Sequence, residues 1–292
     1  MTPPLQSNSG CIVEAVGRDL IVKVGRTTQI VARLLRQIEK QSQFSRSNTL
    51  TDIVVPTINE IRQVRQPGGK EDLSVTMQQI DGLDYISFLE HASFEEIADT
   101  VKTLIGLVRQ SDALSRVNDV PFMVVEKKFY EVLVKIRHNS LVSDAFSESE
   151  LVTCFERYRC RDITIPVGAC HGDLTLTNML FSSGKIALFD FLDAFIETPL
   201  QDMVSLRQDT HFRWAFRWYG NDYNELLVEE KLRYFDGLLQ KHFLTYQYYR
   251  DYGQLFQFLK LLRILPYVTP VTKAATIEAV SQFLVTEQSN GM

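Results

Sequence analysis

The pattern of apolar and polar positions predicts a β-rich first part of the chain. Residues 11–16 and 20–24 are apolar, β-branched runs separated by the turn signal at 17–19, which predicts a hairpin. A helix is expected next, because apolar residues recur at helical spacing after a capping threonine, Thr27 or Thr28. Those apolar positions are Ile30, Val31, Leu34, Leu35 and Ile38.

Two more strands are predicted before residue 81. Residues 53–58 form an apolar run, and Pro56 makes it an edge or bulged strand because proline has no amide hydrogen to donate. Residues 66–72 predict a turn, and residues 73–80 predict a further strand.

Most of the remaining chain carries helical patterns. Apolar stripes at 94–110 and 129–136 predict core faces of helices, and similar patterns run from Pro199 to about residue 287. We therefore expect an α+β protein with a small β-rich lobe over residues 1–82 and a larger helical lobe over residues 83–292.

The exception is the segment 163–192. A strand-like run is followed by two short apolar runs, 179–181 and 186–191, on either side of the turn at 182–185. This hairpin is predicted to lie alone among helices. Because an isolated ribbon is only marginally stable, we expect packing against the helical lobe to hold it.

Composition places the chain among soluble globular proteins. It has 292 residues, of which 45% are hydrophobic and 23% charged. The net charge of −5 argues against a nucleic-acid binder. The first ten residues lack the pattern of a secretory signal, and no apolar run approaches the roughly 20 residues that span a membrane. We expect a cytoplasmic protein without a membrane partner, and the sequence predicts no oligomeric state.

The four cysteines, Cys11, Cys154, Cys160 and Cys170, do not have the spacing of a zinc site. They are interpreted as reduced thiols in the core or near the surface.

The strongest chemical signal is the run His171 to Asn178, with the sequence HGDLTLTN, followed twelve residues later by Asp190. Phosphoryl transfer needs a carboxylate that orients the attacking hydroxyl, and hard oxygen ligands that hold Mg²⁺ on the phosphates. Asp173 suits the first task, and Asn178 and Asp190 suit the second. The hairpin would fold Asp190 back beside Asn178, so the three groups can converge, although Asn178 can also be an ordinary turn residue.

HGDLTLTN resembles the catalytic loop of aminoglycoside phosphotransferases, choline kinases and related small-molecule kinases. The FDF segment at 189–191 resembles the metal-binding aspartate segment that follows this loop. HGD in place of HRD, and the lack of an APE-like segment, favour the small-molecule kinases over protein kinases. The resemblance implies a bilobal, protein-kinase-like fold that uses ATP and Mg²⁺. His171 is interpreted as structural.

The same resemblance assigns a nucleotide-binding role to residues of the first lobe. Lys23, a charge inside an apolar strand, would grip the α- and β-phosphates, or simply lie on a solvated face. Glu39 would be its ion-pair partner, with Glu60 as a rival. Ser9 and Gly10, in the segment SNSG, resemble a reduced phosphate-covering loop, or a generic turn.

The end of the 73–80 strand resembles the hinge between kinase lobes. The carbonyl of Gln78 and the amide of Ile80 would read adenine there, or the segment is simply a strand end. Backbone readout leaves no side-chain signature, so ATP and GTP are not distinguished.

Further residues follow the metal-binding aspartate. Asp202 resembles an aspartate that braces the catalytic loop. Asp193 is expected either to bind the acceptor, which would then be neutral or cationic, or to face solvent. Trp214 and Trp218, four residues apart on a predicted helix, are interpreted as core residues, with acceptor stacking second. The aromatic residues Tyr246, Tyr248 and Tyr249 receive the same interpretation.

The sequence thus predicts a kinase that transfers the γ-phosphoryl group of ATP to a hydroxyl of a sugar, amino alcohol or similar metabolite. One alternative is a catalytically inactive nucleotide-binding scaffold, which has no chemical need for Lys23, Asp173, Asn178 and Asp190 together. A protein kinase is the other alternative.

Overall fold

A computed structural model describes residues 5–6, 11–65, 71–143, 145–220 and 222–290. The chain forms two compact units. The first consists of Met1–Tyr85 together with Asn178–Asp193, and the second consists of Ile86–Thr177 and Ala194–Met292. The hairpin segment that we expected in the helical lobe therefore groups with the N-terminal residues.

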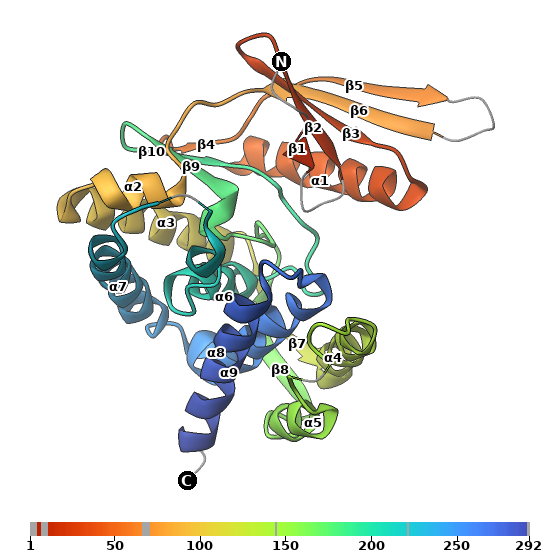
Figure 1. Cartoon of the computed structure of the whole chain (residues 1–292), viewed down its shortest axis with the longest axis vertical. Coiled ribbons are helices and arrows are strands. Elements are labelled where there is room, and N and C mark those ends of the chain that lie inside the picture. Colours follow the sequence, from red (N-terminus) through yellow and green to blue (C-terminus); the bar gives the residue numbers. More distant parts are fainter. Residues whose placement is uncertain (1–4, 7–10, 66–70, 144, 221, 291–292) are drawn as a thin grey trace. The chain divides into compact units, whose positions relative to one another are not determined.

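The first unit contains a five-stranded antiparallel sheet with the order β1-β2-β3-β6-β5. Its elements are β1 (Leu5–Gln6), β2 (Ile12–Val16), β3 (Leu20–Gly25), α1 (Thr28–Ser47), β5 (Ile58–Arg65) and β6 (Glu71–Gln78). Figure 1 shows α1 lying along one face of this sheet. The predicted hairpin at its centre is confirmed, and Gly17 adopts the positive φ of 73° that its turn requires.

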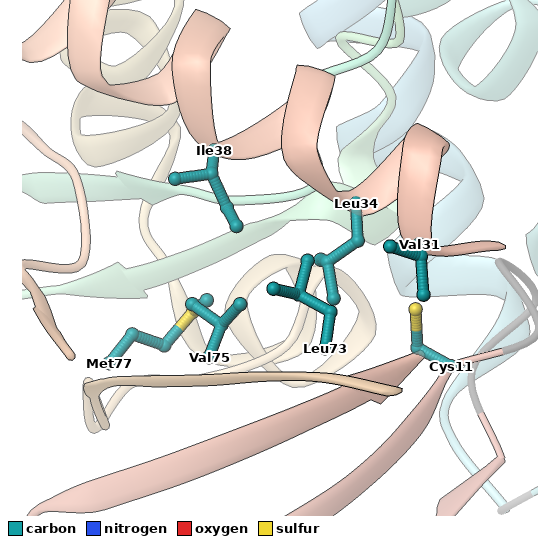
Figure 2. Packing of buried hydrophobic residues seen from close by; sticks show 7 residues of the cluster. All are labelled: Cys11, Val31, Leu34, Ile38, Leu73, Val75 and Met77. Carbon is teal, nitrogen blue, oxygen red and sulfur yellow. The ribbon is translucent and has the colours of Figure 1, made fainter. Parts of the chain in front are cut away.

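The core of this unit lies between α1 and the sheet. The side chains of α1 that point toward β6 recur three and four residues apart, so they share one helix face (Figure 2). The cluster consists of Cys11, Val31, Leu34, Ile38, Leu73, Val75 and Met77. At the start of α1 the hydroxyl of Thr27 accepts a hydrogen bond from the amide of Ile30, at 3.3 Å, as an N-cap does.

A second, three-stranded sheet completes the first unit. The hairpin of β9 (Met179–Ser182) and β10 (Lys185–Leu188) turns through Ser183 and Gly184, both at positive φ, as a two-residue hairpin loop requires. Strand β4 (Ile53–Val54) pairs in parallel with β10. The ribbon predicted to lie alone is therefore part of a three-stranded sheet.

Pro56 explains why the predicted strand 53–58 is divided. The chain forms β4 before this proline and β5 after it, so the two short runs enter different sheets. A proline cannot donate to a ladder, and it marks the place where the chain leaves one sheet for the other.

The second unit is mainly helical. Its α-helices are α2 (Tyr85–His91), α3 (Phe94–Ala113), α4 (Phe122–Arg137), α5 (Glu148–Glu156), α6 (Pro199–Thr210), α7 (Glu225–Phe243), α8 (Gln247–Leu262) and α9 (Lys273–Asn290). The 3₁₀ turns in the described residues are η1 (Leu176–Asn178), which leads into the hairpin of the first unit, η2 (Phe216–Trp218) and η3 (Leu265–Tyr267). Two strands, β7 (Arg116–Pro121) and β8 (Asp162–Val167), pair antiparallel, and only β8 was expected from the sequence.

Helix α6 lies at the centre of this unit. All twelve of its residues are buried, and it packs against α3, α7 and α8. In the same unit, the rings of Phe129 and Phe155 stack with their centroids 4.0 Å apart, and Phe258 stacks on Phe129. A helix buried on all sides is a rigid support for the loops that contact it.

The tryptophan prediction was wrong in its secondary structure. Helix α6 ends at Thr210, and Trp214 lies in a turn, where its indole N–H donates to the hydroxyl of Thr276 at 2.8 Å. The side chain of Trp218 lies outside the described part of the chain. No helix in the described ranges combines the length and the apolar character needed to cross a membrane.

Candidate active site

The loop that begins at His171 is fixed by Asp202 of α6. The carboxylate of Asp202 accepts hydrogen bonds from the backbone amides of His171 and Gly172, at 2.7 and 2.9 Å. Gly172 has a φ of 85°, a conformation that favours glycine and accounts for HGD at this place. The amide of Asp173 in turn donates to Nδ1 of His171, at 3.3 Å. His171 is buried, in agreement with a structural role.

A second aspartate of α6 holds the same loop further along. Asp209 accepts a hydrogen bond from the amide of Leu176, at 2.8 Å. Asp209 is completely buried. Burial raises its pKa to about 7, although the hydrogen bond from Leu176 and the charge of Lys260 act in the opposite direction. Two points of attachment therefore define the backbone on either side of Asp173.

The carboxylate of Asp173 forms an ion pair with Lys260 of α8, at 2.5 Å. Burial alone would raise the pKa of Asp173. The charges of Lys260 and Arg263, the hydrogen bond from Lys260 and the charge of His171 outweigh burial and lower this pKa to about 2. Asp173 is therefore ionised at neutral pH. A quarter of its side chain remains accessible, which leaves room for a hydroxyl group to approach.

In the first unit, the base of the β9–β10 hairpin brings Asn178 and Asp190 together. The amide of Phe189 donates to the carbonyl of Asn178, at 3.2 Å, just beyond the last strand pair. Asp190 follows with a φ of 59°, an uncommon conformation for a residue other than glycine. The chain turns sharply here, and the side chain of Asp190 forms an ion pair with the ammonium group of Lys23.

Lys23 comes from the middle of β3, and it is buried. Ile21, two residues earlier on the same face of the strand, packs against the apolar core, so an ammonium group on this face requires an acidic partner. Asp190 supplies it. The structure thus brings together Lys23, Asp190 and the base of the hairpin at Asn178 within one compact unit.

Asn178 and Asp190 fit a magnesium ion by the chemistry of their donor atoms. An amide oxygen and a carboxylate are hard ligands, and Mg²⁺ usually takes one or two such groups, with water and phosphate oxygens completing its octahedron. Within the described ranges, no cluster of three or more His, Cys, Asp or Glu side chains is arranged to hold a metal. A complete protein cage is not needed for Mg²⁺ on a nucleotide.

One face of α1 contacts the three residues that follow Asp190. The ring of Phe44 lies 5.1 Å from that of Phe191, and the ammonium group of Lys40 donates to the carbonyl of Leu192 at 2.6 Å. Arg36 forms an ion pair with Asp193, at 2.5 Å. These α1 residues are spaced four apart, so they lie along one stripe of the helix.

The acceptor role predicted for Asp193 stays a prediction, and Arg36 lies beside this acid. The negative charge of Asp193 is compensated by Arg36, and about half of each side chain is exposed. The neutral or cationic acceptor that was predicted from this acid therefore stays a prediction.

The predicted ion pair between Lys23 and Glu39 was wrong. Glu39 is exposed, and it accepts a hydrogen bond from Gln43 at 3.3 Å. It follows Ile38, whose side chain faces the sheet, and one residue turns a helix by about 100°. The rival, Glu60, is also exposed and pairs with Arg62. Asp190 takes the place of both as the partner of Lys23.

The remaining nucleotide-site predictions concern backbone groups. Gln78 is the last residue of β6, where its amide donates to the carbonyl of Thr57 at 2.8 Å, and Ile80 follows outside the sheet. Ser9 and Gly10 lie outside the described residues.

Sequence reasoning missed Lys260. A lysine between Leu259 and Leu261, in a long apolar helical run, is the same signal that singled out Lys23 in its strand. Both are charges at positions where the pattern predicts burial, and both form ion pairs with aspartates of the predicted site.

The chain is similar in sequence to a known protein family. The family model described as the phosphotransferase enzyme family matches residues 4–241. No curated protein matches the chain.

Three solved structures illustrate the likeness of fold. The GDP complex of wild-type aminoglycoside 2'-phosphotransferase-IIIa has a TM-score of 0.59 and 16% identity, covering 99% of this chain and 92% of that one. Glucosamine kinase in complex with glucosamine, ADP and inorganic phosphate has a TM-score of 0.56 and 11% identity, covering 96% and 73%. An ADP-bound aminoglycoside phosphotransferase has a TM-score of 0.52 and 13% identity, covering 97% and 91%. The predicted α+β, protein-kinase-like fold class is thereby confirmed.

Proposed function

Because the chain belongs to the phosphotransferase enzyme family, it is a phosphotransferase, and we propose that it transfers the γ-phosphoryl group of ATP to a hydroxyl group of a sugar, an amino alcohol or a similar small metabolite. The family resemblance drawn from the sequence is confirmed by the family match over residues 4–241. The nucleotide, the metal ion and the acceptor are the parts that we propose.

The observation that carries the proposal is the ion pair between Lys23 and Asp190 at the base of the hairpin that also begins with Asn178. A buried lysine beside a carboxylate and an amide oxygen is a suitable arrangement for phosphates and a divalent cation. In this proposal, Lys23 exchanges part of its contact with Asp190 for the α- and β-phosphates, and Asn178 and Asp190 hold Mg²⁺. The metal, when bound, neutralises charge on the phosphate oxygens.

Asp173 has the other central role in the proposed reaction. Its carboxylate accepts a hydrogen bond from the acceptor hydroxyl, at roughly 2.6–3.2 Å in the productive complex, and so aims the oxygen at the phosphorus. A carboxylate with a pKa of about 2 is a weak base. It therefore orients the hydroxyl first and takes the proton late, as the bond to phosphorus forms and the hydroxyl becomes more acidic.

The other predicted residues have supporting roles. The backbone at Gln78 and Ile80 would read the base, and Ser9 and Gly10 would cover the phosphates. None of the four cysteines, all within the described ranges, forms a disulfide.

The test is an assay of ATP consumption by the purified protein against a panel of hydroxylated metabolites, with and without a chelator. We expect one class of acceptor to accelerate ATP consumption, and we expect both the chelator and Asp173→Asn to abolish the acceleration. A protein that binds ATP tightly but never consumes it, with any acceptor, would instead be the inactive nucleotide-binding scaffold.

A further inference from the structure

A buried lysine in the second unit has a position that packing does not explain. Lys260 lies in the middle of α8 with only 3% of its surface exposed, and all of its neighbours from Leu255 to Leu262 are buried. Burial lowers the pKa of Lys260, whereas the charge of Asp173 raises it. An apolar side chain would fill the same space without the desolvation of an ammonium group.

The contact of Lys260 is with the loop that bears the proposed base. Its ammonium group lies 2.5 Å from Oδ1 of Asp173, a residue 87 positions earlier in the chain. The lysine is buried while a quarter of the Asp173 side chain is accessible. Lys260 therefore contacts the carboxylate from the buried side, while a quarter of the Asp173 side chain stays accessible.

Other charges near Asp173 come from each element around it. Arg263 lies at the end of α8 and His171 lies on the loop itself, and both favour the ionised carboxylate. On α6, burial and the charge of Asp173 raise the pKa of Asp209 to about 7, so Asp209 is mostly protonated, and carries little charge, at acidic pH. Lys260 interacts with both aspartates. Without Lys260, burial would raise the pKa of Asp173 against the weaker opposing charges of Arg263 and His171.

We propose that Lys260 is a positioning residue for phosphoryl transfer, whose buried ammonium group keeps the Asp173 carboxylate ionised and fixed in one orientation toward the acceptor. This proposal rests on the proposed function, because it assigns the reaction's hydroxyl-orienting group to Asp173. Its physical core, the electrostatic control of Asp173 by Lys260, is independent of any activity and can be tested separately.

The first experiment measures stability and needs no substrate. The free energy of unfolding is determined between about pH 3 and pH 6 for the wild type, Lys260→Met, Asp173→Asn and the double variant. In the wild type the folded-state pKa of Asp173, about 2, is below its ordinary value of 3.8. Asp173 therefore stabilises the fold above about pH 4, and this contribution is lost as the pH falls toward 2.

Removal of Lys260 should reverse the sign of the contribution that ionised Asp173 makes to stability. Burial would then raise the pKa of Asp173 above its ordinary value, so the ionised carboxylate would destabilise the fold increasingly as the pH rises from about 4. We expect Asp173→Asn to destabilise the wild type near pH 6 but to stabilise the Lys260→Met protein. The same destabilising effect in both backgrounds would overturn the proposal.

Lys231 provides a matched control. It is also a buried lysine in the second unit, but it donates to the carbonyl of Glu90, at 2.9 Å. Lys231→Met should lower stability without changing the effect of Asp173→Asn. If Lys260→Met does not fold, the ¹³C titration of Asp173 in the wild type decides the question. A midpoint clearly below 3.8 supports control of Asp173 by its cationic neighbours, and a midpoint at or above 4 overturns it.

The second experiment uses the pH profile of kcat/KM once an acceptor is known. Lys260→Met should move the acid limb of the profile upward by about one pH unit or more, and Lys260→Arg should restore its position. A uniform loss of activity with an unmoved acid limb would mean that Lys260 only supports the fold. If no acceptor is found but the stability experiment shows the reversal, the proposed function fails while the control of Asp173 stands.

Discussion

Asp202 and Asp209 lie two turns apart on the same face of α6, and both accept hydrogen bonds from backbone amides of the loop that carries Asp173. The loop is therefore attached to a fully buried helix at two points. This attachment removes much of the conformational freedom that a surface loop normally has, and it fixes the direction of the Asp173 side chain.

The first prediction tests this attachment. Asp202→Asn keeps the shape of the side chain but replaces one acceptor oxygen by an NH₂ group, so one buried amide of the loop loses its partner. We expect a loss of about 1–3 kcal/mol in the free energy of unfolding, measured by chemical denaturation. As a control, Asp251→Asn changes an exposed aspartate of α8 that accepts a hydrogen bond from Gln247 one turn earlier, and it should change stability little. Equal effects of the two variants would contradict the bracing role.

The second prediction concerns Asp173. Asp173→Asn should lower kcat by roughly 10²–10⁴, the range for loss of a general base, in an assay at a temperature where the variant is folded. The substitution also leaves the ammonium group of Lys260 buried without its ionic partner, so stability should fall as well.

A double variant separates the two effects. Asp173→Asn with Lys260→Met removes both buried charges, so we expect it to regain stability over Asp173→Asn while remaining inactive. Turnover within a few-fold of the wild type in either variant would show that Asp173 is not the group that orients the hydroxyl.

The third prediction concerns the metal. Nucleotide at about 100 times its Kd should stabilise the protein by about 2.7 kcal/mol, and most of this gain should require Mg²⁺. Asp190→Ala should remove the Mg²⁺-dependent part of the melting shift. Asp193→Ala, three residues later, removes an exposed acid paired with Arg36 and should preserve that shift. A shift that survives chelation in the wild type would argue against the metal site.

The fourth prediction compares Lys23 with Glu39. Lys23→Met should weaken nucleotide binding and turnover strongly, because it removes the cation that lies against Asp190. Glu39→Gln should leave both within a few-fold of the wild type, since Glu39 is exposed and its hydrogen bond is with Gln43 of its own helix. Circular dichroism would confirm that both variants fold. A severe defect in Glu39→Gln would show that the helix acid acts in the nucleotide complex after all.

Features that depend on neighbouring residues in the chain could be predicted from the sequence. The β9–β10 hairpin was predicted because Ser183 and Gly184 suit a two-residue turn, and the run from His171 to Asn178 was singled out by the spacing of Asp173 and Asn178. Lys23 was recognised as a charge in an apolar strand, and the structure buries it.

Contacts between residues far apart in the chain could not be predicted from the sequence. Sequence spacing suggested Glu39 as the partner of Lys23, but the phase of α1 directs Glu39 to solvent, and the true partner is far away in the chain. The contact of β4 with β10 and that of Lys260 with Asp173 likewise depend on tertiary packing. The apolar periodicity of a strand or helix predicts that a residue is buried, but it does not predict which distant residue it contacts.

The composition of the first unit also bears on how the chain folds during synthesis. Ile53 of β4 pairs with Ile186 of β10, so the small sheet cannot close until the ribosome has made more than half of the protein. Contacts of such long sequence separation are slow to form. While α3 to α5 emerge from the ribosome, the edge of β4 would remain unpaired. An unpaired strand edge can pair with other chains, so aggregation of the nascent chain is most favoured at this stage, and chaperone binding would prevent it.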